Sequence, residues 1–247
     1  MSVMWIAADW PAPDNVIGGT TLRTGGVSSG EFTSLNLADH VGDESAAVTE
    51  NRRRFRSELS LPSEPSWLKQ VHGISVAGGN SLPSTPEVDG MVTTAAGVVC
   101  AVLTADCLPV LLTTSSGSTV AAAHAGWRGL SAGILEATVT SLESPAEQIM
   151  AWLGPAISQP AFEVGDEVRE QFMDQSGGAE ACFSVNSRGR WQADLYGLAT
   201  LRLQDCGVTQ VFGGGSCTHA ERERFFSFRR DGGCGRMATF IYRRERQ

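Results

Sequence analysis

Hydrophobic and polar positions alternate in short runs over the first forty residues, a period typical of β-strands. Residues 16–24 (VIGGTTLRT) alternate, residues 25–30 (GGVSSG) interrupt the pattern with turn-forming residues, and residues 32–37 (FTSLNL) resume it. Glycine and serine clusters of this kind separate strands rather than helices. The beginning of the chain is therefore predicted to form short strands joined by turns.

The pattern becomes helical over about residues 46–59, where apolar positions recur at three- and four-residue intervals. Asp43 or Ser45 is the candidate N-cap of this helix, because a short oxygen-bearing side chain can accept a hydrogen bond from the first turn. The basic run at residues 52–56 then lies largely in solvent. The predicted buried face consists of Val48, Phe55 and Leu59.

The centre of the chain contains its longest apolar runs, residues 98–104 (VVCAVLT) and 109–114 (PVLLTT). A polar turn at residues 115–118 and a further apolar run at residues 119–126 (TVAAAHAG) follow the second of them, a succession that predicts a β-hairpin. Such strands are buried on both faces, so each sheet needs cover from another layer. A glycine-, serine- and proline-rich stretch at residues 78–86 is interpreted as a loop.

The rest of the chain alternates helical and strand patterns without an internal repeat or a clear domain boundary. We predict one α+β domain over residues 1–247, a mixed layered sandwich. Its remaining predicted elements are a helix from about residue 128 with a stripe at Leu130, Ile134, Leu135, Val139 and Leu142; strands at residues 148–154, 209–214 and 236–244; and helices from about Gly165 and over residues 194–205.

Composition narrows the function classes. The 247 residues are 42% hydrophobic and 19% charged, a mix that can fill a sizeable core, and the formal net charge is −8. A negative chain is unsuited to a broad electrostatic contact with nucleic acid or anionic lipid. Asp9 interrupts the first apolar run, and no run approaches the roughly 18 residues that span a bilayer. A cytoplasmic protein is expected, with six scattered cysteines as thiols.

Asp106 and Cys107 are unusual because they interrupt two apolar runs in residues 104–112 (TADCLPVLL). Cys107 precedes the first strand of the predicted hairpin and His124 ends the second, so the two are expected at the same end of it. With His72, they would make a three-ligand metal site that leaves one position for a reactant. Two alternatives remain open at this point: all three side chains simply pack, or Cys107 and His124 form the nucleophile and base of a thiol hydrolase.

Several motifs resemble one family. Residues 68–73 (LKQVHG), 103–112 (LTADCLPVLL), 121–130 (AAAHAGWRGL), 152–157 (WLGPAI) and 162–168 (FEVGDEV) resemble the bacterial laccase-domain family. Its members are also called multicopper polyphenol oxidases, and they are described as purine nucleoside phosphorylases; the mammalian relative is FAMIN. Further similar stretches extend the resemblance over essentially the whole chain: residues 22–30, 34–43, 50–55 and 225–241.

The resemblance implies a zinc site made by His72, Cys107 and His124; this donor set could also take up copper in vitro. It implies phosphorolysis of adenosine, inosine and S-methyl-5′-thioadenosine, with adenosine deamination as a further activity. It also implies a fold similar to the catalytic domain of cytotoxic necrotizing factor toxins. Zinc deaminases use an HxE motif, but Ala125 and Gly126 follow His124 here, so Asp106 joins the catalytic candidates as the proton carrier.

Phosphate and a purine nucleoside are then the expected partners, bound by a monomer or weak dimer. For phosphate we consider Arg52, Arg128 and the backbone amides of residues 25–30 and 40–43, and we favour Arg52, because it and its neighbours on the helix cannot all face solvent. For ribose we consider Asn36, with His40 as a neighbour. Phe226, or Phe228 beside it, could stack on the purine. Gln70 could hydrogen-bond near the metal. Several of these positions have a structural alternative: a solvated helix face for the basic run, above all Arg53 and Arg56; a turn or capping role for Asn36 and His40; and a core position for the phenylalanines.

Three other functions compete. Relatives are described as peptidoglycan editing factors that remove L-serine from a muramic acid precursor, a hydrolysis that a zinc-activated water would suit. Copper-dependent phenol oxidation, the origin of the family name, needs many more histidines than the four present. A non-catalytic zinc-binding module is the third, and the position left for a reactant argues against it.

Overall fold

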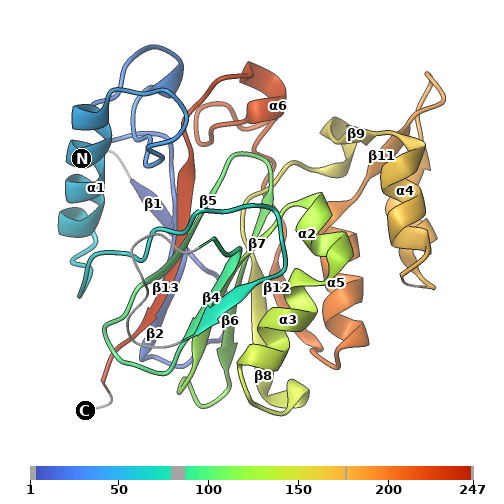
Figure 1. The fold of residues 1–247 in the computed structure, drawn as a ribbon, viewed down its shortest axis with the longest axis horizontal. Coiled ribbons are helices and arrows are strands. Elements are labelled where there is room, and N and C mark those ends of the chain that lie inside the picture. Colours follow the sequence, from blue (N-terminus) through green and yellow to red (C-terminus); the bar gives the residue numbers. More distant parts are fainter. Residues whose placement is uncertain (1–3, 79–86, 176, 246–247) are drawn as a thin grey trace.

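Two β-sheets packed face to face form the centre of the molecule (Figure 1). The computed structural model describes residues 4–78, 87–175 and 177–245. Within them, one sheet has the order β1 (Trp5–Ala7), β2 (Val16–Thr21), β13 (Met237–Arg243), β5 (Cys100–Thr104). The other has the order β12 (Gln210–Gly213), β8 (Ile149–Leu153), β6 (Leu108–Thr114), β7 (Val120–Ala125), β4 (Gly90–Thr93), β3 (Val76–Gly78).

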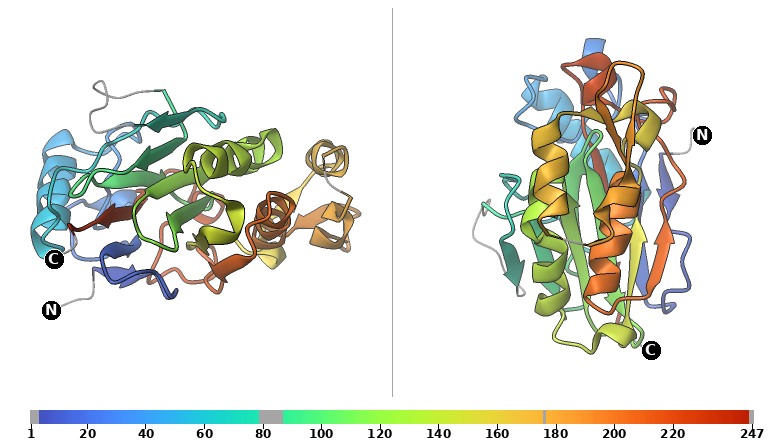
Figure 2. Two further views of the ribbon diagram at one scale, coloured as in Figure 1. Left: turned by 90° about the horizontal axis from the view of Figure 1, so that it is seen from below. Right: turned by 90° about the vertical axis from the view of Figure 1, so that its right-hand side faces the viewer.

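Helices cover the outer faces of both sheets. α1 (Ser45–Glu58) lies on the four-stranded sheet, where Phe55 packs on Phe240 of β13 with ring centroids 5.3 Å apart. α2 (Trp127–Ala132), α3 (Ile134–Ser141) and α5 (Leu195–Asp205) lie on the six-stranded sheet, and Figure 2 shows α3 and α5 side by side. The result is the α+β layered sandwich that the two-faced apolar strands predict.

A smaller unit extends from the helical side of the six-stranded sheet (Figure 1). It contains α4 (Asp166–Met173) and a three-stranded antiparallel sheet in the order β10 (Phe183–Val185), β11 (Trp191–Ala193), β9 (Glu163–Val164). Its apolar side chains, such as Phe172 and Phe183, belong to the same buried cluster as those of α3 and α5. Short 3-10 turns lie at Gly30–Phe32, Ala146–Gln148, Gln159–Ala161 and Ala179–Cys182.

The space between the sheets is filled by side chains of strands that are buried on both faces. Leu111 of β6 is fully buried there, and its Cδ1 would lie 2.9 Å from a Cβ added at Gly18 of β2, so the sheets approach closely at this point. The inter-sheet cluster comprises Val16, Leu68, Met91, Cys100, Val102, Leu111, Val120, Ala122, Trp152 and Ile241. No helix in the described part of the chain is long and apolar enough to cross a bilayer.

The predicted hairpin is confirmed, and its register decides where the polar junction lies. β6 and β7 are antiparallel, with Pro109 opposite His124. However, β5 belongs to the other sheet, where it pairs with β13. Residues 105–107 are therefore the point at which the chain crosses from one sheet to the other. This crossing explains why a carboxylate and a thiol follow one apolar strand and precede the next.

Three predictions about local structure were wrong. The helix expected over residues 128–142 is two helices, because Gly133 adopts a left-handed conformation (φ 111°) between α2 and α3. The N-cap of α1 is Glu44, and the Asp43 carboxylate instead accepts hydrogen bonds from the Glu44 backbone N–H and from Ser28. Residues 32–37 contain no strand: Phe32 ends a 3-10 turn, and residues 33–35 form a further turn. The predicted loop at residues 78–86 lies outside the described residues, except for Gly78, which ends β3.

Truncating Leu111 tests the inter-sheet layer. Leu111→Ala removes a fully buried side chain and leaves a cavity between two sheets that cannot easily collapse, so the free energy of unfolding should fall by about 2–5 kcal/mol. Urea titration followed by circular dichroism measures it. The matched control is Val185→Ala on the edge strand β10, where the side chain is 64% exposed and a change within about 0.5 kcal/mol is expected. Equal effects at the two positions would contradict this account of the core.

Candidate metal centre

Three potential metal ligands meet at one end of the β6–β7 hairpin. His72 lies in the loop before β3, Cys107 at the crossing between the sheets, and His124 in β7. Their donor atoms all lie within 4.8 Å of one another, and Cys107 Sγ is 4.0 Å from His72 Nε2. The two imidazole rings are nearly perpendicular, with centroids 4.8 Å apart. The structure thus brings together residues 35 and 17 positions apart in sequence.

A buried carboxylate that the sequence did not single out organises two of these ligands. Asp89 lies immediately before β4 and is fully buried. Its Oδ1 lies 2.8 Å from His124 Nδ1 and accepts a hydrogen bond from the backbone N–H of His72 at 3.0 Å. Its Oδ2 accepts hydrogen bonds from the backbone N–H groups of Val71 and Gly73. One side chain therefore fixes the orientation of His124 and the backbone on both sides of His72.

This hydrogen-bond pattern also decides which imidazole nitrogen of His124 can bind a metal. A carboxylate that accepts from Nδ1–H leaves Nε2 as the nitrogen on the side of the cluster, where a metal would take the place of its proton, the arrangement found around many histidine ligands of zinc. The positive φ of His72, 60°, belongs to a tight loop whose three consecutive N–H groups point at Asp89. Backbone geometry thus holds the more exposed ligand.

The electrostatics of the cluster favour a thiolate. Burial alone would raise the pKa of the Cys107 thiol, but the adjacent His124 and His72 outweigh this and lower that pKa to about 6. Burial alone would lower the pKa of His124, whereas Cys107 and Asp89 raise it to about 9. Burial also opposes the ionised form of Asp89, yet the hydrogen bonds from His124 and Gly73 bring its pKa below the usual value. The sulfur is thus in the form that ligates metals.

The donor set fits a zinc ion. Tetrahedral zinc with bonds of about 2.0–2.1 Å to nitrogen and about 2.3 Å to sulfur separates those two ligands by about 3.6 Å, close to the observed 4.0 Å. Gly126 leaves room beside the cluster, because a Cβ there would lie 3.1 Å from both Cys107 Sγ and His72 Cδ2. Among the described residues the cluster has three members, which leaves one position of a tetrahedral ion for a reactant.

The three ligands line a cavity of about 530 Å³. Its walls combine cationic and aromatic side chains, a composition suited to an anionic and partly planar ligand. Phe228 is 58% exposed, which is unusual for a phenylalanine and leaves its ring available to a ligand. The cationic and aromatic residues on the walls are Arg128, Arg229, Arg236, Trp127, Phe162 and Phe228.

Two of the predicted substrate-binding residues line this cavity. Arg128 is exposed beside it, and its Cζ lies 4.3 Å from the centroid of the Trp127 ring. Gln70 also lines it, but its amide is paired with Leu103, donating to the backbone carbonyl and accepting from the backbone N–H. His40, which we predicted from the sequence to lie near the ribose, lines the cavity as well.

The other three predicted substrate-binding residues do not line it. Asn36 is fully buried and bonds to the backbone of Ala38 and Arg236. Arg52 donates to the Leu37 carbonyl and stacks on Trp67, with its Cζ 4.3 Å from the ring centroid.

Phe226 is fully buried beneath the Arg23 guanidinium. Phe228, the other phenylalanine considered for stacking on the purine, does line the cavity. The rings two residues apart point into different environments because Phe228 begins the short helix α6 (Phe228–Asp231), whereas Phe226 precedes it.

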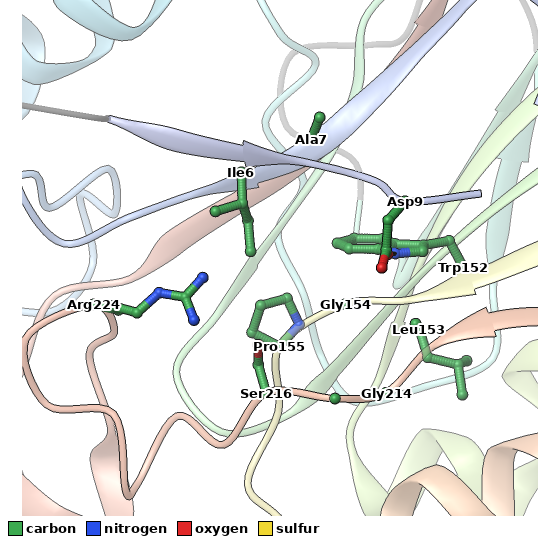
Figure 3. A pocket seen from close by; sticks show the side chains of 12 residues that line it. Ile6, Ala7, Asp9, Trp152, Leu153, Gly154, Pro155, Gly214, Ser216 and Arg224 are labelled. Atoms are coloured by element: carbon green, nitrogen blue, oxygen red, sulfur yellow. Dashed lines mark hydrogen bonds between the residues drawn. The ribbon is translucent and has the colours of Figure 1, made fainter.

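A second cavity, of about 380 Å³, is lined in part by Gly154 and Pro155 of the loop that follows β8 (Figure 3). Its lining includes Ile6, Trp152, Pro155 and three consecutive glycines at residues 213–215. The charged groups on its wall already have partners: Arg224 bonds to Glu221, and Asp9 accepts a hydrogen bond from the Trp152 indole. None of the metal-ligand candidates belongs to it, so the larger cavity is the candidate active site.

Removing the negative charge of Asp89 should weaken metal binding without removing a ligand. Asp89→Asn keeps the side-chain shape but cannot accept at both oxygens, so His124 and the His72 loop lose part of their support. We expect the affinity for zinc to fall by about 10- to 100-fold, measured by competition with a chromophoric chelator. Asp174→Asn, at an exposed position, is the matched control and should leave affinity unchanged. Unaltered zinc affinity in the Asp89 variant would contradict the orienting role.

Comparison with known proteins agrees with the resemblance carried by the motifs. The chain is 49% identical over 240 residues to a purine nucleoside phosphorylase of Pseudomonas aeruginosa, covering 96% of this chain and 98% of the relative. It is 50% identical over 238 residues to the purine nucleoside phosphorylase YfiH of Escherichia coli, with the same coverage.

Solved structures give the same result for the fold. A Neisseria meningitidis protein assigned to family DUF152 superposes with a TM-score of 0.94 at 46% identity, over 98% of this chain and all of that one. YlmD from Geobacillus stearothermophilus superposes with a TM-score of 0.92 at 32% identity, over 99% and 98%. The family model described as multi-copper polyphenol oxidoreductase laccase matches residues 18–244. With its fold, motifs and relatives in agreement over nearly its full length, the chain belongs to the multi-copper polyphenol oxidoreductase laccase family.

Proposed function

We propose that this chain is a zinc-dependent purine nucleoside phosphorylase that acts on adenosine, inosine and S-methyl-5′-thioadenosine. The observation that carries the proposal is one cavity whose wall holds the His72–Cys107–His124 cluster, arginine side chains and an exposed aromatic ring. The names of relatives at 45–50% identity support the reaction class. The proposed catalytic domain is the single unit of residues 1–247, which the match over residues 18–244 supports.

Arg128 is the proposed phosphate-binding residue. None of the ion pairs formed among the described residues includes it, so its charge is available to an anion. The other two arginines of the cavity are partly engaged, since Arg229 donates to the Glu163 carbonyl and Arg236 to the Cys234 carbonyl. Arg52, which is half-buried against Trp67, is proposed to support α1 instead.

Phe228 is the proposed purine platform. Base stacking on an exposed aromatic ring contributes about 1–3 kcal/mol in nucleic-acid-binding proteins and tolerates different bases. This tolerance suits a site that accepts both adenosine and inosine. Arg236 approaches the same ring, with its Cζ 5.8 Å from the centroid, and so adds a cation near the bound purine.

Phosphorolysis needs few covalent contributions from the protein. A phosphate oxygen attacks C1′ of the ribose, the bond from C1′ to purine N9 breaks, and the purine leaves with a proton while ribose 1-phosphate forms. Arg128 would orient the phosphate and Phe228 the purine, so that the two reactants meet in one geometry. Zinc held by the cluster would supply Lewis-acid polarisation of a substrate atom.

Incubation with inosine, with and without phosphate, tests the function. Phosphate-dependent release of hypoxanthine and ribose 1-phosphate, followed by chromatography and mass spectrometry, is the expected result. Ammonia release from adenosine in the same assay would add the deaminase activity. Cleavage of a serine-linked muramic acid precursor without phosphorolysis would favour the editing hydrolase, and zinc retention without any turnover would favour a binding module.

Removing His124 should abolish both metal binding and turnover. His124→Ala removes one of the three candidate metal ligands and leaves two. We therefore expect activity to fall on the order of 100-fold or more. Metal content is measured by mass spectrometry, and folding by circular dichroism. His219→Ala, at a histidine outside the cavity, should keep both the metal and the activity. A metal-free His124 variant with full turnover would disprove the role of the metal in catalysis.

Arg128 and Arg52 form a matched pair for the phosphate site. Arg128→Ala should raise the KM for phosphate by about 10- to 100-fold, the effect of losing a hydrogen bond to a charged group, with a much smaller change for nucleoside. Arg52→Ala should instead lower the melting temperature, because it removes contacts to Leu37 and Trp67, and should leave the KM for phosphate nearly unchanged. Steady-state kinetics with each substrate varied separately distinguishes the two, and the reverse pattern would return the phosphate site to Arg52.

A further inference from the structure

The carboxylate of Asp106 accepts three hydrogen bonds from other parts of the protein. Asp106 lies at the crossing between the sheets, next to Cys107, with φ at 93° and only 9% of its surface exposed. Its Oδ1 accepts a hydrogen bond from the Thr218 hydroxyl at 2.6 Å. Its Oδ2 accepts from the Ser227 hydroxyl at 3.0 Å and from the backbone N–H of Arg229 at 2.6 Å. Both carboxylate oxygens are thus occupied by the protein's own donors.

Two of these donors, Ser227 and Arg229, adjoin Phe228, which lines the same cavity as the candidate metal ligands. Arg229 follows Phe228 in α6, and both line the cavity. Ser227 is the N-cap of α6, since its hydroxyl oxygen accepts from the Arg230 N–H. The backbone carbonyl of Asp106 also accepts from the N–H of Ile157, another residue of the cavity wall. One residue therefore connects the metal ligand Cys107 to two stretches of the substrate wall.

α6 depends on these contacts for its orientation. A four-residue helix is far too short to be stable by itself, so neighbouring groups must hold it. Arg230 supplies one anchor by donating to the carbonyls of Thr218, His219 and Phe225. Asp106 supplies the other at the first turn, where it accepts from Ser227 and Arg229, the residues on either side of Phe228.

We infer that Asp106 is a positioning residue for the substrate: its carboxylate holds the start of α6 so that Phe228 and Arg229 face the metal cluster. In this role it accepts hydrogen bonds and transfers no proton. The inference differs from the expectation, drawn from its neighbourhood in sequence, that Asp106 is the proton carrier. Its kinetic consequences rest on the proposed phosphorolysis, whereas its structural consequence for α6 does not.

The asparagine variant separates the two roles. In Asp106→Asn, the amide oxygen can take the place of Oδ2 and still accept from Ser227 and Arg229, while the amide NH₂ donates to the Thr218 hydroxyl, which can accept as well as donate. The network is therefore preserved although the side chain can no longer carry a proton. Asp106→Ala removes all three hydrogen bonds.

A positioning role predicts different kinetics for the two variants. Asp106→Ala should lower kcat/KM for inosine by about 10- to 100-fold, mainly through KM, with zinc content unchanged. Asp106→Asn should recover most of this loss and stay within about fivefold of the wild type. Ser227→Ala, which removes one of the three donors and the cap of α6, should shift KM in the same direction as Asp106→Ala and guards against a variant that fails to fold.

Limited digestion with trypsin provides a readout that needs no substrate. Cleavage after Arg229 or Arg230 requires α6 to open, so Asp106→Ala and Ser227→Ala should be cut there at least about tenfold faster than the wild type, and Asp106→Asn at nearly the wild-type rate. If the wild type shows no phosphorolysis, the proposed function fails while this digestion pattern still tests the positioning role.

Two results would overturn the inference. The first is an Asp106→Asn protein that keeps its zinc and its resistance to trypsin yet is as inactive as Asp106→Ala, because this combination identifies a proton carrier. The second is an Asp106→Ala protein with wild-type digestion at α6 and a wild-type KM, because the carboxylate would then not hold the helix.

Discussion

The buried contact between Asp89 and His124 is the interaction on which the candidate metal centre depends. A carboxylate that loses all contact with solvent is costly unless hydrogen bonds compensate for its hydration. Here three backbone N–H groups and one imidazole N–H provide that compensation. The same hydrogen bonds set the tautomer of His124 and the conformation of the His72 loop. Satisfying one buried charge thus preorganises two of the three ligands.

The two-sheet architecture explains why the third ligand and the substrate wall meet at the same place. The chain leaves the four-stranded sheet after β5 and enters the six-stranded sheet at β6, so the connecting residues lie at the shared end of both sheets. Cys107 points to the metal ligands and Asp106 to α6, although the two are adjacent in sequence. A single crossing therefore contributes both to the His72–Cys107–His124 cluster and to the support of α6 on the cavity wall.

Neighbourhood in sequence was a good guide to the convergence of the three candidate metal ligands and a poor one to which other residues line the cavity. Cys107 precedes β6 and His124 lies in β7, so antiparallel pairing brings these two together, whereas His72 comes from a loop and its arrival at the cluster depends on the fold. Residue type alone does not distinguish Arg52, Asn36 and Phe226 from nearby arginine, polar or phenylalanine residues. Their roles depend on which way a loop or helix turns, and Phe228 and Arg128 reach the cavity only because of that turn. Asp89 was missed because three of its four partners are backbone N–H groups, which every residue except proline possesses.

The sequence by itself determined the α+β class, the hairpin, most of the helices and the family, because hydrophobic periodicity and short-range motifs depend on residues close together in the chain. The sequence also predicted that Cys107 and His124 lie at the same end of the hairpin, because a short turn between two strands fixes which residues pair. Only the tertiary structure decided that β5 and β6 lie in different sheets, that Gly133 breaks a helix, and which arginine faces the cavity. Those features follow from packing between segments far apart in the chain, where the free energy of burial outweighs local preference.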